Sequence, residues 1–498
     1  MLNSKFYEIM KTIKHIIFAI TATTMMGACT LERDNFTDIT PEQVYQTEGD
    51  LKLMVNALYT QFQAYTWMTT YDLSEMSAGT LRTSWGDDER YFQQWTRTVG
   101  MQSLAWTEFS WYKFLSQARN VVRGIENSPV ADTNKSRWLG EAKAMRGWMA
   151  VYLYDVFGTV PVATDAQLDA PETFNYIGRL SDQEYEAMVV SDLTGAIETL
   201  PEKQDERGRM TKGAAMMLLM KFYMMKGYFD KAETLCRQLY AMEGKVYNLQ
   251  SDYNHIFSYD GMGNDEVILQ ITCNDASRNT CNFVVADAMP TDFPWAEKAT
   301  GWGRGFIMPW EFYDTFEAGD ARLQNVYDHY TSKNGNQVTR GQLGTGAIPI
   351  KYGLQDNMIG DQCTIDMVVY RYSDVLLTLA ELITRNQNTL TQEAIDLVNR
   401  VRNRAQLPNL SIEQTASKEA FMDALLMERL HEFYLEGLSR QDEIRFGKYI
   451  EWANKRINDS NQNSGTAYYN VDDSHLKLFI PQSFIDESMN AIKQNPGY

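Results

Sequence analysis

The feature of this 498-residue sequence that most constrains its fold is a run of helical patterns between residues 370 and 446. In 370–384, and again in 391–405, apolar residues recur every three or four positions, which is the spacing of one helix face. A polar turn at 385–388 separates the two patterns, and Pro408 ends the second. Because a hairpin of two helices cannot bury its apolar faces alone, it must stack on other helices.

A similar hairpin pattern occupies residues 211–244. Placing Ala232 at the small-residue position of a tetratricopeptide hairpin puts Gly227 at the turn and Leu219 on the packing face, and Ala394 gives a second partial match. From 247 to 366 the pattern changes to loops and short strands. The sequence therefore predicts a mainly α fold: a tetratricopeptide-like helical-hairpin scaffold with a loop-rich face and a few short strands.

A third helix is expected from Lys418 to Arg440. One of its faces is apolar, and another carries Glu428, Glu432 and Glu436 together with Arg440. Charges at this spacing are typical of a helix face that is either solvated or internally paired, and we interpret them in that way rather than as a binding site.

The run MERLHEFYLEGLSRQDEIR at 427–445 resembles the glutamate–arginine and glutamate–glycine signature of the SusD/RagB family. Residues 141–161, 308–323, 394–405 and 493–498 resemble further stretches of that family, so the resemblance spans nearly the whole mature chain. It implies a non-enzymatic surface lipoprotein that captures nutrients, mostly glycans, for a SusC-like TonB-dependent transporter of the outer membrane.

The N-terminal residues have the pattern of a lipoprotein signal. Lys11 and Lys14 precede the apolar run 16–20, which is too short to span a membrane, and the pattern ends in Gly-Ala-Cys. This ending resembles the bacterial lipobox, in which Cys29 becomes the acylated N-terminus; an ordinary cleaved signal is the alternative. Since each buried CH2 contributes about 0.8 kcal/mol, two or three acyl chains would hold the protein on a membrane.

These patterns set the expected boundaries between the segments of the chain. Residues 1–28 are predicted to be a lipoprotein signal peptide and 29–40 a lipidated tether. Residues 41–498 are predicted to form a single helical domain, with 247–366 as its loop-rich insert. Met10 looks a more natural start than Met1, and the sequence leaves that choice open.

Charge and cysteine content exclude several classes of protein. The net charge of -19 argues against nucleic-acid binding, because a phosphate backbone needs a basic face. Five cysteines are too few for a disulfide framework in a chain of this length. Cys273 and Cys281 flank a short turn-like segment and are candidates for pairing in an oxidising compartment, whereas Cys236 lies on an apolar helix face.

Standard catalytic signatures are missing. His431 and Glu432 begin a pair of the zinc-protease type, but position 435 is leucine, so we expect no histidine metal site, no catalytic residue and no cofactor. With 65 acidic residues a carboxylate pair can always assemble in space, so a surface glycoside hydrolase stays open as an alternative. A member of the family that binds peptides or stabilises an assembly is the other alternative.

Glycan binding has better support from the sequence. A sugar ring has an apolar C–H face and a polar rim, so its site needs flat aromatic rings beside planar hydrogen-bonding groups. Residues 65–111 and 292–304 offer this combination, and the resemblance implies that loops from these two regions hold the ligand. The candidate ligand-binding residues are Trp67, Arg82, Trp85, Asp87, Trp95, Trp295, Trp302 and Arg304. Four other tryptophans at helical spacing are expected in the core: Trp106, Trp111, Trp138 and Trp148.

Overall fold

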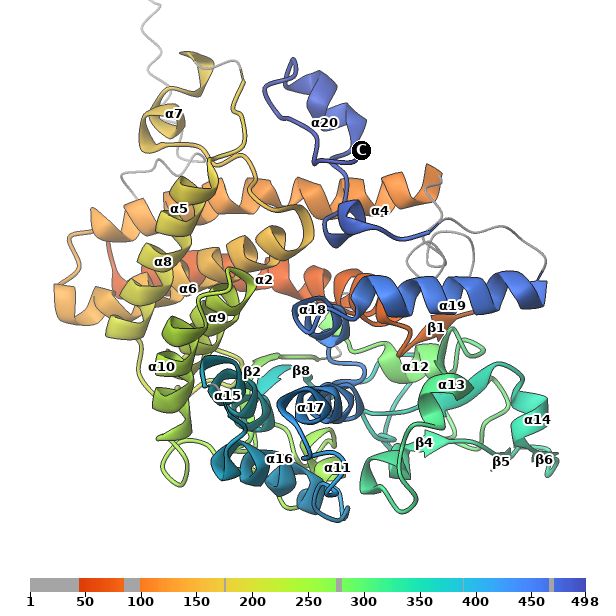
Figure 1. Ribbon diagram of the computed structural model, residues 1–498. Coiled ribbons are helices and arrows are strands. Elements are labelled where there is room, and N and C mark those ends of the chain that lie inside the picture. The colour runs from red at the N-terminus through yellow and green to blue at the C-terminus, as the bar shows by residue number, and fades with distance from the viewer. Residues whose placement is uncertain (1–43, 85–98, 174–175, 275–279, 388, 465–469) are drawn as a thin grey trace, which may run out of the picture. The chain divides into compact units, whose positions relative to one another are not determined.

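The computed structural model describes residues 44–84, 99–173, 176–274, 280–387, 389–464 and 470–498, and residues 47–498 form one compact unit. Helices dominate this unit (Figure 1), which confirms the predicted mainly α fold. Among the described residues, no helix combines the length and the apolar character that crossing a membrane requires.

The scaffold is a continuous series of packed helices (Figure 1). Each helix contacts the next one in the order α5, α6, α8, α9, α10, α15 and α16, and α17 packs on α15. Because α10 and α15 are far apart in sequence, the loop-rich insert must leave the stack and return to it. The bounds are α2 (Glu48–Met68), α5 (Tyr112–Glu126), α6 (Asp132–Phe157), α8 (Asp182–Thr199), α9 (Lys212–Met225), α10 (Phe229–Tyr240), α15 (Tyr372–Asn386), α16 (Gln392–Arg404) and α17 (Lys418–Phe433).

The two predicted hairpins are confirmed in detail. Gly227 turns the chain between α9 and α10 with φ of 73°, a left-handed conformation that favours glycine. Ala232 and Ala394 are fully buried, as close packing of helices requires. Thr211 and Thr391 cap α9 and α16, each accepting a hydrogen bond from a backbone N–H of the first turn.

Further helices, most of them short, lie outside this stack. They are η2 (Thr69–Met76), α4 (Val99–Ser110), α7 (Asp165–Asp169), η3 (Pro171–Thr173), α11 (Tyr253–Ile256), α12 (Val284–Ala288), α13 (Trp310–Tyr313), η5 (Ala321–Asn325), α14 (Arg340–Leu343), α18 (Ser439–Arg445), α19 (Tyr449–Ser464), η6 (Asp473–Leu476) and α20 (Gln482–Glu487). In Figure 1, α12 to α14 lie on the right-hand side, in the loop-rich part.

Short antiparallel strands organise the insert. The order of the main sheet is β1 (Arg82–Thr83), β3 (Phe306–Pro309), β7 (Gly346–Pro349) and β4 (Val326–Tyr327). A second pair joins β2 (Val267–Ile271) to β8 (Met367–Arg371), and a third joins β5 (Tyr330–Thr331) to β6 (Gln337–Val338). Since β8 runs directly into α15, the second pair connects the insert to the helical stack.

The third predicted helix is wrong in its extent. It ends at Phe433, the chain turns with positive φ at Leu435 and Gly437, and α18 begins at Ser439. Lys351 Nζ donates to the carbonyls of Glu432 and Tyr434, at 3.1 and 2.5 Å, and so satisfies backbone groups that the helix end leaves open. The buried Lys351 therefore fixes the end of α17 at Phe433, although the apolar spacing in the sequence continues beyond this residue.

The charged residues of this segment are buried and internally paired. Glu432 is fully buried and bonds to Arg371 and Arg404, with Arg322 Nη1 at 3.3 Å from Oε2. Burial alone would raise the pKa of Glu432, but the three guanidinium groups outweigh it and hold that pKa well below its ordinary value. Of the two interpretations offered by the sequence, internal pairing is the correct one.

The prediction for the helical tryptophans holds only in part. Trp138 and Trp148 are buried, as expected, and Trp111 is half-buried. Trp106 is 47% exposed, so its assignment to the core is wrong. Its ring stacks on Phe484 of α20, with 5.7 Å between ring centroids. The helix face predicted to be buried therefore contacts a short C-terminal helix at the surface at this position.

We expect Glu432→Gln to lower the free energy of unfolding by about 3–5 kcal/mol, because it leaves buried guanidinium groups without their counter-charge. Glu451→Gln, at an exposed position of α19, is the matched control and should change stability very little. Urea unfolding followed by circular dichroism measures both values. Equal stability of the two variants would contradict the role given to Glu432.

Glu108 provides a test of pH dependence. It is buried on α4, and burial raises its pKa to about 8. Between its ordinary pKa and 8 the folded state keeps a proton that the unfolded state loses, so stability falls as the pH rises through this range. The neutral variant Glu108→Gln should match the wild type near pH 4 and gain up to about 1.4 kcal/mol on it per pH unit towards pH 8. Urea unfolding at four pH values checks this difference, and a gap of constant size would refute it.

Candidate functional site

The two regions that the sequence marked for ligand binding meet in the structure. β1 pairs with β3, in the register Arg82 to Ile307 and Thr83 to Phe306. Beyond the strand, Ser84 donates from its N–H to the carbonyl of Gly305 at 3.1 Å and from its hydroxyl to the carbonyl of Arg304 at 2.7 Å. Residues 82–84 of the first region are thus bonded directly to the chain at 304–307, where the second region ends.

The predicted site residues differ in what the structure describes of them. Trp85, Asp87 and Trp95 lie outside the described residues, as does Cys29. Trp67 belongs to the last turn of α2, but its side chain is also outside the described part. Arg82, Trp295, Trp302 and Arg304 are described, and the site is built from them.

Trp302 is the best-supported aromatic ring of this site. It is half-buried, and its indole Nε1 donates to Asp361 Oδ2 at 3.1 Å. The ring stacks on Phe283, with centroids 5.3 Å apart and planes 26° apart. A stack and a hydrogen bond together fix the plane of the indole while part of it still reaches solvent.

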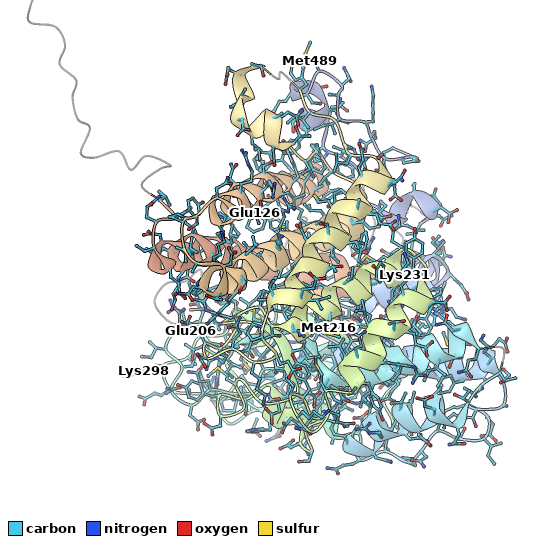
Figure 2. All side chains as sticks on the ribbon, turned by 90° about the vertical axis from the view of Figure 1, so that its left-hand side faces the viewer. Glu126, Glu206, Met216, Lys231, Lys298 and Met489 are labelled. Atoms are coloured by element: carbon cyan, nitrogen blue, oxygen red, sulfur yellow. The ribbon has the colours of Figure 1, made fainter. Side chains whose placement is uncertain are left out.

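The loop that carries Trp302 is held to a neighbouring loop by backbone bonds. Thr300 N donates to the carbonyl of Gly360 at 2.7 Å, and Gly360 N donates to the carbonyl of Lys298 at 2.8 Å. A Cβ at Gly301 would lie 2.5 Å from the carbonyl oxygen of Met289, so only glycine allows this close approach. Lys298, at the start of the loop, is exposed and labelled in Figure 2.

Arg304 has a structural use. Its backbone has φ of 68°, and its guanidinium donates to the carbonyls of Leu343 and Gly346, both at 2.7 Å. Burial lowers the pKa of Arg304, although the group keeps its hydrogen bonds. The side chain therefore ties the Trp302 loop to the chain that enters β7.

Trp295 and Arg82 are the other two described residues of the candidate site. Trp295 is half-buried, and its Nε1 is buried without a hydrogen-bond partner among the described residues. Arg82 Nη2 lies 3.3 Å from Glu311 Oε1, and the Glu311 side chain is 70% exposed. Arg82 thus presents a planar hydrogen-bonding group at the surface next to β3.

Sequence reasoning missed the two side chains that fix Trp302. Asp361 lies in a segment that was predicted only to be loop-rich, and Phe283 follows the turn between Cys273 and Cys281. A third missed group is Trp310, covered by the Arg340 guanidinium at 4.0 Å from its ring centroid. The Gly360-Asp361 pair is the sequence signal that could have pointed to this segment. Its contact with Trp302 could not be predicted in this way, because the two side chains are some 60 residues apart in the sequence.

The structure also contains a polar cavity of about 370 Å3 away from these residues. The loops 202–209 and 262–265 line it, and Glu206, labelled in Figure 2, stands on the first of them. None of the predicted ligand-binding residues lines this cavity. The candidate site is therefore a surface built by the Trp302 loop rather than this hollow.

The histidine that began a zinc-protease pattern is part of the core. His431 is buried, its Nε2 lies 2.8 Å from the Thr315 hydroxyl, and burial together with Arg322 and Arg402 lowers its pKa well below the ordinary value. Its neighbour Glu432 is held by three guanidinium groups. Both side chains are occupied in packing and ion pairing. Within the described ranges, no three His, Cys, Asp or Glu side chains gather to hold a metal ion.

Comparison with known proteins gives consistent matches along the chain. A family described as "SusD family" matches residues 312–498, and a family described as "Starch-binding associating with outer membrane" matches residues 31–224. A SusD-like protein of Bacteroides ovatus is 24% identical and aligns with 88% of this chain and 83% of its own length. The starch-binding protein SusD of Bacteroides thetaiotaomicron is also 24% identical and aligns with 86% of this chain and 85% of its own length.

Solved structures share the fold. A laminarin-binding SusD-like protein superposes with a TM-score of 0.73 at 22% identity, covering 91% of this chain and 100% of the other. The surface glycan-binding protein A of Bacteroides thetaiotaomicron, in complex with laminarihexaose, gives 0.69 at 20% identity and covers 90% and 99%. With the helical stack, the loop-rich insert and matches to SusD families at both ends, the chain belongs to the SusD/RagB family.

Proposed function

We propose that this protein is a glycan-binding lipoprotein of the outer cell surface that captures oligosaccharides and passes them to a TonB-dependent transporter in the outer membrane. The single observation that carries the proposal is the half-buried indole of Trp302, fixed by Phe283 and Asp361 where the two predicted regions meet. A flat ring held in this way suits stacking on the C–H face of a sugar.

Polar groups on β1 and α13 suit the hydroxyl rim of a sugar. Arg82 of β1 and Glu311 of α13 lie 3.3 Å apart and offer a planar donor and an acceptor. Arg304 acts behind the site by holding the loop in place. Trp67, Trp85, Asp87, Trp95 and Trp295 remain part of the proposed site as predicted from the sequence.

The relatives support binding rather than catalysis. Proteins of this fold are described as binding starch, laminarin or laminarihexaose, and none of these descriptions names an enzyme. One of the matching families is described as associating with the outer membrane. We extend this to a lipid anchor at Cys29 and to delivery through a SusC-like partner, so that the transporter rather than this chain supplies the energy of uptake.

We expect Trp302→Ala to weaken oligosaccharide binding by about 30-fold, the size of effect that a central aromatic anchor has when truncated. Isothermal titration with laminarihexaose, maltoheptaose and a xylogluco-oligosaccharide measures the affinity of the wild type and the variant. Trp106→Ala is the matched control, because Trp106 is an exposed tryptophan of α4 outside the proposed site. Wild-type affinity in Trp302→Ala, or equal losses in both variants, would refute the site.

A second prediction concerns location and partner. Cys29→Ser should release the protein from detergent-extractable outer membrane into the soluble fraction, because the acyl chains supply the attachment. The wild type should co-purify with a TonB-dependent transporter and leave every oligosaccharide of the panel intact. Release of shorter sugars would favour a glycoside hydrolase, and co-purification without any glycan binding would favour an assembly protein of the same family.

A further inference from the structure

The segment between η2 and β1 is buried, although it leads to a strand at the surface. From Leu73 to Thr83 every residue is buried except Gly79 and Arg82, which are half-buried. η2 itself is a π-helix, a kind of helix that is rare and that, where it occurs, frequently lies at a functional site. We call residues 77–84, which follow η2 and include β1, the β1 strap.

Glu75 joins this strap to the turn before α18. It lies in the last turn of η2 and is fully buried. Its carboxylate Oε2 accepts hydrogen bonds from the Thr80 hydroxyl at 2.5 Å and from the Ser439 hydroxyl at 2.9 Å, and Oε1 accepts one from Gly437 N at 2.9 Å. One side chain therefore connects the first predicted binding region with the segment that follows α17.

The backbone of Glu75 holds the same end of the strap. Its carbonyl accepts hydrogen bonds from Thr80 N at 3.1 Å and from Leu81 N at 3.3 Å. Arg82, which begins β1, follows directly. Because β1 has only 2 residues, its pairing with β3 specifies the register weakly, and the bonds of the strap have to supply the rest.

We infer that Glu75 is a positioning residue of the proposed glycan site, which holds the β1 strap in place and so sets the position of Arg82 relative to the ligand. The inference rests on the proposed function, in which Arg82 offers a planar donor to the rim of a sugar. Because Glu75 is fully buried, it cannot touch a ligand itself. Any effect of Glu75 on binding therefore passes through the strap.

An acceptor, rather than a charge, is what the position of Glu75 needs. The three donors that it binds are neutral, and a hydroxyl group can accept a hydrogen bond as well as donate one. Glutamine can accept from Gly437 N with its carbonyl oxygen and donate from its amide nitrogen to the hydroxyls of Thr80 and Ser439. Alanine leaves all three groups without this partner. Glu75→Gln should thus keep the strap in place, whereas Glu75→Ala should release it.

Isothermal titration of the full chain with laminarihexaose, maltoheptaose and a xylogluco-oligosaccharide tests this difference. We expect Glu75→Ala to weaken the binding of whichever oligosaccharide the wild type binds by about tenfold, a loss no larger than that in Arg82→Ala, and Glu75→Gln to keep wild-type affinity. Because Glu75 acts through Arg82, the double variant should bind as Arg82→Ala does. Losses that add in the double variant, or equal losses in Glu75→Ala and Glu75→Gln, would overturn the inference.

Two further variants separate position from stability. Thr80→Val removes one hydroxyl of the strap with almost no change of volume, so it perturbs the fold less than Glu75→Ala and should weaken binding about threefold. Glu381→Ala is the matched control, because Glu381 is fully buried in α15 and paired with Arg445. It should lower the unfolding temperature and leave the affinity unchanged. Wild-type affinity in both strap variants, or an equal loss in the control, would contradict the role of Glu75.

Hydrogen exchange provides a measurement that needs no ligand. The amides of 77–84 should exchange faster in Glu75→Ala than in the wild type and in Glu75→Gln, whereas Glu381→Ala should not change them. Unchanged exchange in Glu75→Ala would overturn the inference whether or not the protein binds glycans. Faster exchange in a protein that binds none of the three oligosaccharides would refute the proposed function and the role of Glu75 in binding, but not the hold of Glu75 on the strap.

Discussion

Buried ion pairing around Arg371 is the interaction on which the rest of this structure depends. Arg371 is fully buried where β8 meets α15, and its guanidinium bonds to Glu266, Glu432 and Glu436. Glu266 directly precedes β2, Glu432 belongs to α17, and Glu436 lies in the turn before α18. Breaking a buried pair leaves an uncompensated charge, so each element is held by the charge of the others. The helical stack and the loop-rich insert are joined at this point.

For a buried glutamate, the neighbouring charges decide whether its pKa lies above or below the ordinary value, and so how it affects stability as the pH changes. Glu432 and Glu108 are both buried, yet three guanidinium groups lower the pKa of the first, whereas burial raises the pKa of the second. Among the described residues no cation lies within ion-pair distance of Glu108, although Arg440 exerts a longer-range effect. The fold therefore contains carboxyl groups that act in opposite directions on stability as the pH rises.

Local periodicity predicted the helical stack, and contacts distant in sequence account for what it missed. The apolar spacing and the small residues Ala232 and Ala394 were sufficient for the hairpins, because helix faces are encoded within a few turns. The end of α17 could not be read in this way, since Lys351 fixes it from 80 residues earlier. The same holds for the support of Trp302, which comes from Phe283 and Asp361, and for Trp106, whose exposure depends on where α20 packs.

The buried charges also explain how a rigid scaffold carries the proposed binding surface, which is made of loops. Lys351 follows β7 by two residues and bonds to Glu436, while Arg322 precedes β4 and bonds to Glu428. Both strands belong to the sheet whose β3 continues from the Trp302 loop. These two cations thus hold the sheet on α17 and on the turn that follows it, while the hydrogen bonds of Arg304 and of the loop backbone hold the Trp302 loop on that sheet. Side chains at the surface of the loop can then vary to suit one glycan or another without disturbing the scaffold that holds the loop. For this reason the fold can be assigned with less information than the identity of the ligand.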